Sequence, residues 1–179
     1  MDKQAIRKQT IEKRSMLGKE YRKKASLDIC RKITELVSKD KKVFIYLPME
    51  EEVDTTQLHE FYTQVCVPKC VDSTTMVAVC DFTAFKKTAF GYLEPIDGRI
   101  ITDIDVAIVP GVAFTEDMDR IGYGGGFYDR FFQKNPKVQK IAVCFDCQLR
   151  NDFVGEKHDI KMDCIVTEKR LVFGDEKCV

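Results

Sequence analysis

The apolar residues of this chain occur in short continuous runs separated by segments with helical spacing. The runs predict buried strands at 42–48, 65–67, 76–80, 105–110, 140–145 and 163–168. Apolar residues three and four positions apart predict helices at 19–38 and 55–65, and further helices are expected at 2–14 and 127–133. Strands that alternate with helices favour an α/β fold: a single domain with a largely parallel central sheet flanked by helices and an N-terminal helical segment.

Sheets of this kind bind ligands beyond the carboxyl ends of their strands. The loops that follow Leu47, Val109 and Phe145 are therefore expected to meet at one edge of the sheet.

Length and composition favour one folded domain over residues 1–179. The chain is 44% hydrophobic and 32% charged, a balance typical of globular proteins and too apolar for disorder. No run approaches the roughly 20 apolar residues that a membrane-spanning helix needs, and the N-terminal residues lack the apolar core of a signal peptide. We therefore expect a cytoplasmic monomer that binds no membrane.

The first 42 residues are strongly basic. They contain 14 Lys and Arg against 6 Asp and Glu, in a chain whose net charge is zero. Such a segment is either a surface that binds nucleic acid or phosphate, or a solvated helix face. A nucleic-acid-binding module built on the basic N-terminal helices is therefore an alternative. We expect no nucleic-acid partner, because the chain lacks the exposed aromatic pattern of an RNA-binding sheet.

The eight cysteines are expected to be reduced thiols, because disulfides are rare in a reducing compartment. Cys66 and Cys70 could be combined with Cys144 and Cys147 into a four-thiolate zinc site. Cys144, however, lies in the apolar run KIAVCF, where cysteine behaves as a small hydrophobic residue. This setting disfavours zinc.

The stretch RIGYGGGFYDRFF at 120–132 holds four of the ten glycines of the chain. Clustered glycine costs backbone entropy unless the chain needs positive φ angles or a close approach. A P-loop would end in Gly-Lys-Ser/Thr, whereas Phe127 follows the last glycine here. A nest of backbone N–H groups at a helix N-terminus fits the stretch better, and such a nest favours phosphates.

A nicotinamide-dependent oxidoreductase is a second alternative. Asp146 ends a predicted strand and could bind a ribose, as the acidic residue of a Rossmann fold does. The glycines, however, follow Pro110 at a greater distance than the tight turn of that fold allows.

The glycine stretch is part of a longer ordered pattern. The run PGVAF at 110–114, followed by RIGYGGGFYD at 120–129, resembles the signature of the 5-formyltetrahydrofolate cyclo-ligase (5,10-methenyltetrahydrofolate synthetase) family. The resemblance covers nearly the whole chain, because further matching positions occur in order: Lys3, Arg7, Met49, Glu52–Thr55, Pro68, Lys69, His158, Asp159, Asp163, Thr167 and Glu168.

The resemblance implies a ligase that uses ATP and Mg²⁺ to convert 5-formyltetrahydrofolate into 5,10-methenyltetrahydrofolate. By match to the family, ATP would be held by Lys3, Arg7, Arg120, Ile121, Gly122, Tyr123, Gly124, Gly125, Gly126, Phe127 and Tyr128, of which Arg120 and Tyr128 would act in catalysis. The folate would be contacted by Met49, Asp54, Tyr123, Gly124, Gly125, Gly126 and Phe127. The magnesium ligands would be Asp129 and Asp159.

Two positions depart from the family pattern. Tyr123 occupies a position that is basic in some relatives, and Asp54 stands where others have the longer Glu. Asp54 is also suited to cap the helix that follows it. Asp129 could likewise act only as a partner of the helix dipole.

Overall fold

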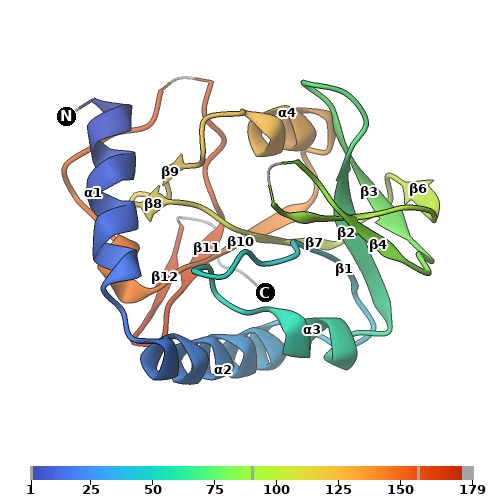
Figure 1. Ribbon diagram of the computed structural model, residues 1–179, viewed down its shortest axis with the longest axis horizontal. Helices are drawn as coiled ribbons and strands as arrows, with labels where there is room; N and C mark the ends of the chain where they lie inside the picture. The colour runs from blue at the N-terminus through green and yellow to red at the C-terminus, as the bar shows by residue number, and fades with distance from the viewer. Residues whose placement is uncertain (1, 90, 157, 175–179) are drawn as a thin grey trace.

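The computed structural model describes residues 2–89, 91–156 and 158–174. Its centre is an eight-stranded sheet (Figure 1). From one edge to the other, the strands are β12 (Leu171–Phe173), β11 (Cys164–Val166), β10 (Gln139–Val143), β7 (Val106–Val109), β1 (Lys42–Ile45), β2 (Gln64–Cys70), β3 (Met76–Cys80) and β6 (Arg99–Ile101). The five strands from β11 to β2 are parallel, whereas β12, β3 and β6 join the sheet through antiparallel pairs with β11, β2 and β3. The expected α/β fold with a largely parallel sheet is confirmed.

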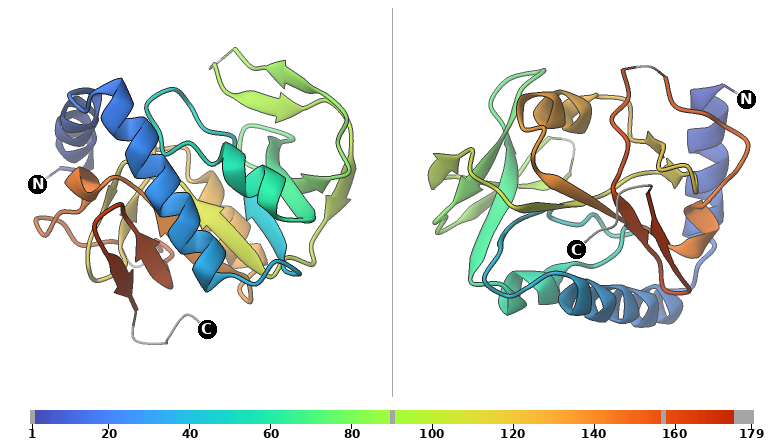
Figure 2. Two further views of the ribbon diagram at one scale, coloured as in Figure 1. Left: turned by 90° about the horizontal axis from the view of Figure 1, so that it is seen from below. Right: turned by 180° about the vertical axis from the view of Figure 1, so that it is seen from behind.

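Helices cover both faces of this sheet. In Figure 1, α2 (Lys19–Leu36) and α3 (Thr56–Phe61) lie below it, and α4 (Phe127–Lys134) lies above it. α1 (Lys3–Ser15) stands at one side, as the two further views in Figure 2 show. Within this described part of the chain, no helix is both long and apolar enough to cross a membrane.

The alternation of side chains along β1 divides the core into two layers. Val43 and Ile45 pack with the apolar face of α2, whereas Phe44 belongs to the cluster on the α4 side. There the ring of Phe44 stacks on Phe131 with 4.8 Å between centroids. β7 is buried along its whole length, which explains its uninterrupted apolar run.

The predicted elements exist, but several end elsewhere. The helix expected at 55–65 stops at Phe61, because β2 begins three residues later. The strand expected at 42–48 ends at Ile45, and Tyr46 then uses its carbonyl to accept the hydroxyl of Thr55 at 3.1 Å. β2 runs far beyond the predicted 65–67, through Pro68. Proline is tolerated there because residues 64–66 pair with β1, whereas 67–70 pair only with β3.

Six short strands were not expected, among them β6 and β12 at the two edges of the central sheet. β4 (Phe85–Lys87) and β5 (Leu93–Pro95) form a hairpin that projects from the sheet, and β8 (Ala113–Phe114) pairs with β9 (Arg120–Ile121). These strands have two or three residues each, too few for an alternating pattern to be recognised. The 3₁₀ turn η1 (Asp146–Gln148) was not expected either.

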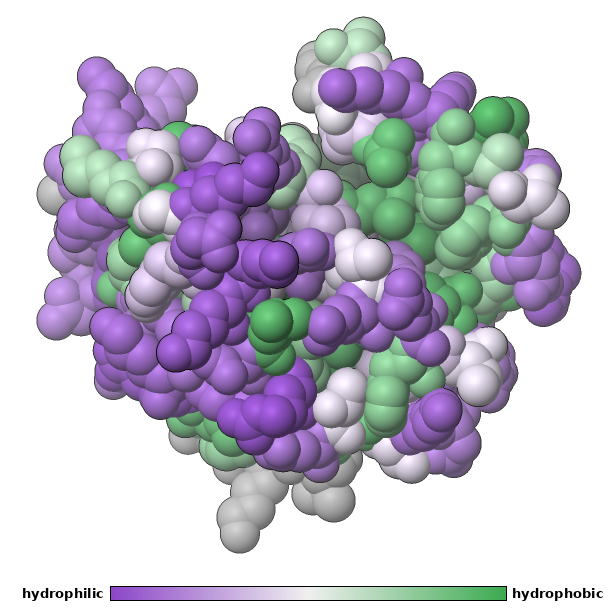
Figure 3. Space-filling view, turned by 60° about the horizontal axis from the view of Figure 1, so that its bottom comes forward, coloured by the Kyte–Doolittle hydropathy of each residue, from purple (hydrophilic) through white to green (hydrophobic). Residues whose placement is uncertain are grey.

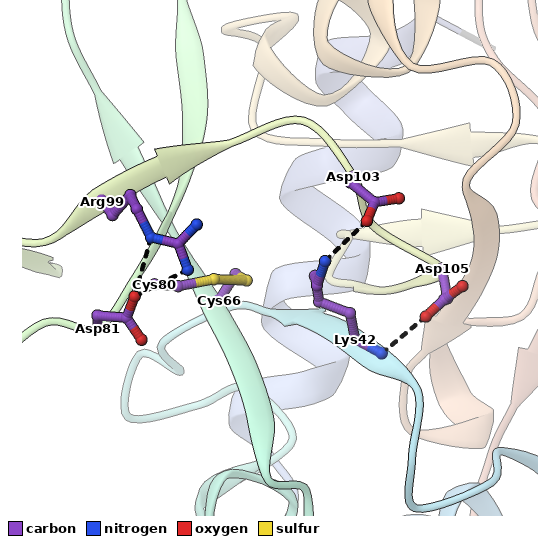
Figure 4. Close-up of a disulfide and its surroundings, with 7 residues drawn as sticks. All are labelled: Lys42, Cys66, Cys80, Asp81, Arg99, Asp103 and Asp105. Carbon is purple, nitrogen blue, oxygen red and sulfur yellow. Dashed lines mark hydrogen bonds and ion pairs between the residues drawn. A yellow bond between two sulfur atoms is a disulfide. The ribbon is translucent and has the colours of Figure 1, made fainter.

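The expectation of reduced thiols is wrong for one pair of cysteines. Cys66 on β2 and Cys80 on β3 form a disulfide (Figure 4). The antiparallel register places them opposite each other, with 4.4 Å between their Cα atoms. This pairing removes Cys66 from any zinc site, and among the described residues no group of three or more His, Cys, Asp and Glu side chains is arranged to hold a metal.

The buried side chain of Gln148 holds the turn after β7 in place. Its buried amide nitrogen donates to the carbonyls of Gly111 and Val112, each at 2.9 Å, and its oxygen accepts the N–H of Phe145 at 3.0 Å. Each buried polar group left unpaired costs about 1–3 kcal/mol. We expect Gln148→Met to lower the free energy of unfolding by at least about 3 kcal/mol. Urea denaturation would measure this loss, and an unchanged midpoint would contradict it.

Candidate active site

A large cavity lies beyond the carboxyl ends of β1 and β7. Its volume is about 1270 Å³, and Leu47 and Pro110, which follow these strands, form part of its wall. Phe145, which follows β10, does not line the cavity. The 3₁₀ turn η1 comes next in the sequence, and its Gln148 donates a hydrogen bond to the turn after β7. The other walls come from α1, the β4–β5 hairpin, residues 120–130 and residues 158–159. In Figure 3 a recess opens at the upper edge, between a mostly hydrophilic surface on the left and the hairpin.

The glycine loop, residues 122–126, forms one wall of this cavity and leads directly into α4. Gly124 has φ +105°, and Gly126, the N-cap of α4, has φ +65°. Both values favour glycine. Within the described part of the chain, no backbone N–H of residues 122–126 donates a hydrogen bond. Unpaired N–H groups at a helix N-terminus are an anion-binding arrangement, so the loop fits a phosphate chain.

Two arginines from distant parts of the sequence support the loop. Arg7 on α1 donates its Nε to the carbonyl of Gly122 at 2.7 Å. Arg120, just before the loop, is buried and only 7% exposed. Its guanidinium lies 5.3 Å from the ring centre of Tyr128. The buried Nε of Arg120 has no partner among the described residues. Such an unpaired buried donor at a cavity wall is suited to an anionic ligand.

Asp129 and Asp159 both line the cavity, and each already has a cationic partner. Asp129 accepts a hydrogen bond from Nη2 of Arg120 at 3.0 Å, and Asp159 accepts one from Nζ of Lys3 at 2.8 Å. The two acids are close along the wall, because the N–H of Ile160 donates to Asp129 at 3.2 Å. Burial would raise the pKa of Asp159, but its hydrogen bonds from Lys3 and from the backbone lower it below the usual value. The fold therefore brings together two carboxylates that are far apart along the chain.

Glu52 is a buried acid of the cavity and contacts Tyr123 of the glycine loop. It is 8% exposed, and its two oxygens accept the N–H of Met49 at 2.9 Å and the hydroxyl of Tyr123 at 2.8 Å. Tyr123 in turn accepts Nη2 of Arg14 at 3.1 Å. Burial raises the pKa of Glu52, and these hydrogen bonds lower it only in part. Glu52 can accept further hydrogen bonds from a ligand, because each oxygen has a second lone pair.

Asp54, the acid chosen from the sequence, does not line the cavity. Its carboxylate accepts the N–H and the hydroxyl of Thr56, at 3.0 and 2.6 Å, and so closes the turn before α3. Met49, in contrast, is in the cavity wall as expected. The sequence EEVDT contains the acids at 51, 52 and 54 in almost identical surroundings, so nothing in it marks Glu52 as the buried one.

Comparison with known proteins decides the identity of this arrangement. The model of the 5-formyltetrahydrofolate cyclo-ligase family matches residues 1–168. The chain belongs to this family. Its members are ATP-dependent ligases, and the family matches support neither a nucleic-acid-binding module nor a nicotinamide enzyme. Asp146 also lies outside the cavity wall, paired with Arg170 at 2.7 Å.

Individual cyclo-ligases resemble the chain over most of its length. A probable 5-formyltetrahydrofolate cyclo-ligase of Schizosaccharomyces pombe is 29% identical over 177 residues, covering 82% of this chain and 85% of the relative. The solved structure of Aquifex aeolicus 5,10-methenyltetrahydrofolate synthetase has a TM-score of 0.85 at 31% identity and covers 99% of this chain and 95% of that one. A synthetase structure from Mycoplasma pneumoniae has a TM-score of 0.77 at 24% identity, with 94% and 99% covered, and shows the same fold.

The cyclo-ligase cavity also contains residues that no pattern in the sequence assigns to a ligand. Beside Glu52, they are Arg130 on α4, Cys70 and Met76 on β2 and β3, and Lys86, Lys87, Tyr92 and Glu94 on the hairpin. The hairpin carries no apolar pattern that predicts a strand, so the sequence does not place its residues in the site. Arg130 lies one position beyond the matched RIGYGGGFYD run.

Glu52 is expected to set the acidic limit of folate turnover. If the ionised carboxylate accepts N–H groups of the substrate, kcat/KM for 5-formyltetrahydrofolate falls as the pH drops through the raised pKa of Glu52. The acidic limb therefore lies above the usual value of 4.5. Glu52→Gln should lower kcat/KM at least about 10-fold and remove this limb. The measurement is the pH profile of kcat/KM at saturating ATP, corrected for the ATP-independent rate.

The stability of the same variant provides the control. Ionising a buried carboxyl whose pKa is raised costs folding free energy at neutral pH, and the cost disappears as the pH falls through that pKa. Glu52→Gln is therefore expected to retain its melting temperature at pH 7. A variant with full kcat/KM and an unchanged acidic limb would show that Glu52 does not contact the substrate.

Proposed function

We propose that the cavity binds both substrates of the cyclo-ligase reaction side by side, with ATP at the glycine loop and 5-formyltetrahydrofolate against Met49 and Glu52. As a member of its family, the chain is an ATP-dependent ligase that cyclises 5-formyltetrahydrofolate to 5,10-methenyltetrahydrofolate. The volume of about 1270 Å³ supports the placement, because one drug-sized ligand usually occupies a pocket of about 300–1,000 Å³. We further propose that the whole chain is one cyclo-ligase domain.

The phosphate side of the cavity is formed by the glycine loop and the cations around it. The unpaired N–H groups of residues 122–126 would receive the phosphate oxygens, and Arg7 and Arg120 would neutralise their charge. Lys3 reaches the same end of the cavity, where Asp159 holds it. This arrangement of unpaired N–H groups beside the guanidinium groups of Arg7 and Arg120 is the observation that supports the proposal most strongly.

The folate side is formed by the segment after β1 and by the outer part of the loop. The reduced pterin presents neighbouring N–H donors, which a carboxylate accepts as a pair. Glu52 is the acid placed for this contact, and we propose it in place of Asp54. Met49 and Phe127 offer apolar surface for the ring, and Tyr123 orients Glu52 through the hydrogen bond between them.

The reaction needs the formyl oxygen to become a leaving group. The formyl oxygen attacks the γ-phosphorus of ATP, the bond from that phosphorus to the β-phosphate bridge oxygen breaks, and ADP leaves. The N10 lone pair of the folate then attacks the formyl carbon, N10 loses its proton, and the C–O bond breaks to release phosphate carrying the former formyl oxygen. Phosphoryl transfer depends mainly on positioning and charge neutralisation.

Arg120 and Tyr128 are placed to assist this transfer. Arg120 has a fixed position, because Asp129 holds its Nη2 and the ring of Tyr128 lies against its guanidinium. Its charge would stabilise the phosphoryl group in transit. Burial raises the pKa of Tyr128 well above its usual value, so the phenol stays protonated and can donate a hydrogen bond at any working pH.

Asp129 and Asp159 fit a magnesium ion carried by the nucleotide. Mg²⁺ usually takes one or two protein carboxylates and completes its shell with water and phosphate oxygens, so a pair of acids is sufficient. When bound, the ion would neutralise phosphate charge. Asp129 and Asp159 would hold it, and Lys3 and Arg120 would then keep fewer of their present contacts with these acids.

We also propose that the protein acts as a cytoplasmic monomer without a nucleic-acid partner. Sedimentation velocity in the presence of both substrates would show one species near 20.6 kDa. A dimer at micromolar concentration would contradict the monomer.

The chemical route can be tested with labelled substrate. If the formyl oxygen is phosphorylated, 5-formyltetrahydrofolate carrying ¹⁸O in the formyl group transfers the label to the released phosphate. Mass spectrometry of the phosphate reads this directly. Label that appears in water while the phosphate stays unlabelled would contradict the route.

A further inference from the structure

Arg130 on α4 lies against the glycine loop at Gly125, whereas Arg7 contacts the loop at Gly122. Nη2 of Arg130 donates to the carbonyl of Gly125 and its Nε donates to the carbonyl of Thr74, both at 2.6 Å. The guanidinium also lies 5.2 Å from the ring centre of Phe127. Arg130 therefore connects the loop to the turn between β2 and β3, and it forms part of the cavity wall.

The glycines of the loop leave room for three guanidinium groups. A Cβ added at Gly122 would come within 2.8 Å of Nη1 of Arg120, and one added at Gly126 within 2.6 Å of Nη1 of Arg130. At Gly124 the nearest atom is the central guanidinium carbon of Arg7, at 3.7 Å. An arginine thus occupies the side-chain position of every second residue, although the loop itself contains no basic residue.

The charges of these groups are not equally compensated. Arg120 is paired with Asp129, and Lys3 is paired with Asp159 and Glu156. Within residues 2–89, 91–156 and 158–174, neither Arg7 nor Arg130 has a carboxylate within 4.0 Å. Both donate only to backbone carbonyls there. Nη1 of Arg130 donates no hydrogen bond to any described residue, so it has two free N–H groups beside the loop.

We propose that Arg130 is a further nucleotide-binding residue, whose Nη1 binds the phosphate chain of ATP while Nε and Nη2 hold the guanidinium in place. The inference rests on the proposed position of ATP at the glycine loop. Arginine suits this role because its planar group can donate to a carbonyl and a phosphate at the same time. The competing explanation is that Arg130 only clamps Thr74 to Gly125.

Calorimetric titration of the full chain separates these explanations. ATP with excess Mg²⁺ and 5-formyltetrahydrofolate are titrated separately into the wild type, Arg130→Gln and Arg130→Lys. Lys134→Gln, on the same helix but outside the cavity wall, is the matched control. A charge-assisted contact predicts that Arg130→Gln raises the Kd for ATP about 10- to 100-fold. The Kd for the folate should change less than about 3-fold, Arg130→Lys should be intermediate for ATP, and Lys134→Gln should equal the wild type.

A clamp alone predicts a different result. Loss of the clamp would disturb the whole loop, which is also proposed to touch the folate, so both ligands would weaken to a similar extent. That outcome, or an unchanged Kd for ATP, would overturn the inference. If Arg130→Gln does not fold, as judged from its thermal melt, the comparison of ATP with folate in Arg130→Lys decides by the same criterion. A wild type that fails to bind ATP would instead contradict the proposed function itself.

Discussion

Gly124→Val is expected to weaken ATP binding at least about 100-fold while the protein remains folded. Gly124 has φ +105°, a conformation that costs a β-branched residue about 1–3 kcal/mol. The new side chain would also approach the guanidinium of Arg7, which lies 3.7 Å from the Cβ position. The variant can relieve this strain only by moving the loop, and the loop carries the N–H groups proposed to bind phosphate. Titration calorimetry with ATP measures the loss.

Gly18→Val is the matched control for this experiment. Gly18 has φ −59°, and nothing lies within 4 Å of its Cβ position. The substitution removes a tolerated N-cap residue from α2 and should cost no more than about 1 kcal/mol of stability, with an unchanged Kd for ATP. Equal ATP affinity in Gly124→Val and Gly18→Val would mean that the glycine loop does not hold the nucleotide.

Asp129→Asn is expected to reduce kcat at least about 100-fold and also to lower the melting temperature. The variant removes the charge that balances Arg120, which is only 5% exposed at its side chain and already has an unpaired Nε. Because Asn keeps the size and part of the hydrogen bonding, we expect a loss of about 1–3 kcal/mol. For a domain of this length, each kcal/mol lowers the melting temperature by about 2–4 °C. If Asp129 interacted only with the helix dipole, Asp129→Asn would lose only about 0.3–1 kcal/mol of stability and would keep the wild-type kcat.

Asp163→Asn separates the stability effect from the chemistry. Asp163 pairs with Lys140 at 2.9 Å, outside the cavity wall, so its variant should lose stability and keep kcat. Raising the Mg²⁺ concentration should restore part of the activity of Asp129→Asn, because a weakened metal site fills at higher concentration. If Asp129→Asn turned over at the wild-type rate at low Mg²⁺, Asp129 would not be a metal ligand.

The sequence predicted the elements whose burial is continuous. β7 and β10 are apolar runs buried in the middle of the sheet, and α2 has one apolar stripe, so a local pattern was sufficient. The β4–β5 hairpin has no such pattern, because Phe85, Lys86 and Lys87 are all exposed. The pairing of Cys66 with Cys80 depends on the register of two antiparallel strands, which composition and compartment do not reveal.

The candidate site divides in the same way. The glycine loop carries its own signal, because positive φ angles and close approaches select glycine locally. Glu52 and Arg130 carry none. Glu52 lines the cavity, and its acidic neighbours do not, because the turn of the chain after β1 directs only Glu52 towards the cavity. Arg130 is significant only because Gly125 and Thr74 are brought to it by the fold. Contacts between distant segments decide such roles, and one sequence does not contain them.

The central claim is that this cavity couples ATP to ring closure of 5-formyltetrahydrofolate. Purified protein is mixed with 5-formyltetrahydrofolate, Mg²⁺ and ATP, and the absorbance of 5,10-methenyltetrahydrofolate is followed while ADP is quantified. We expect product to form only with ATP, one ADP for each methenyl product, and no product with Gly124→Val at the same ATP concentration. Absence of ATP-dependent product from folded wild-type protein would contradict the account.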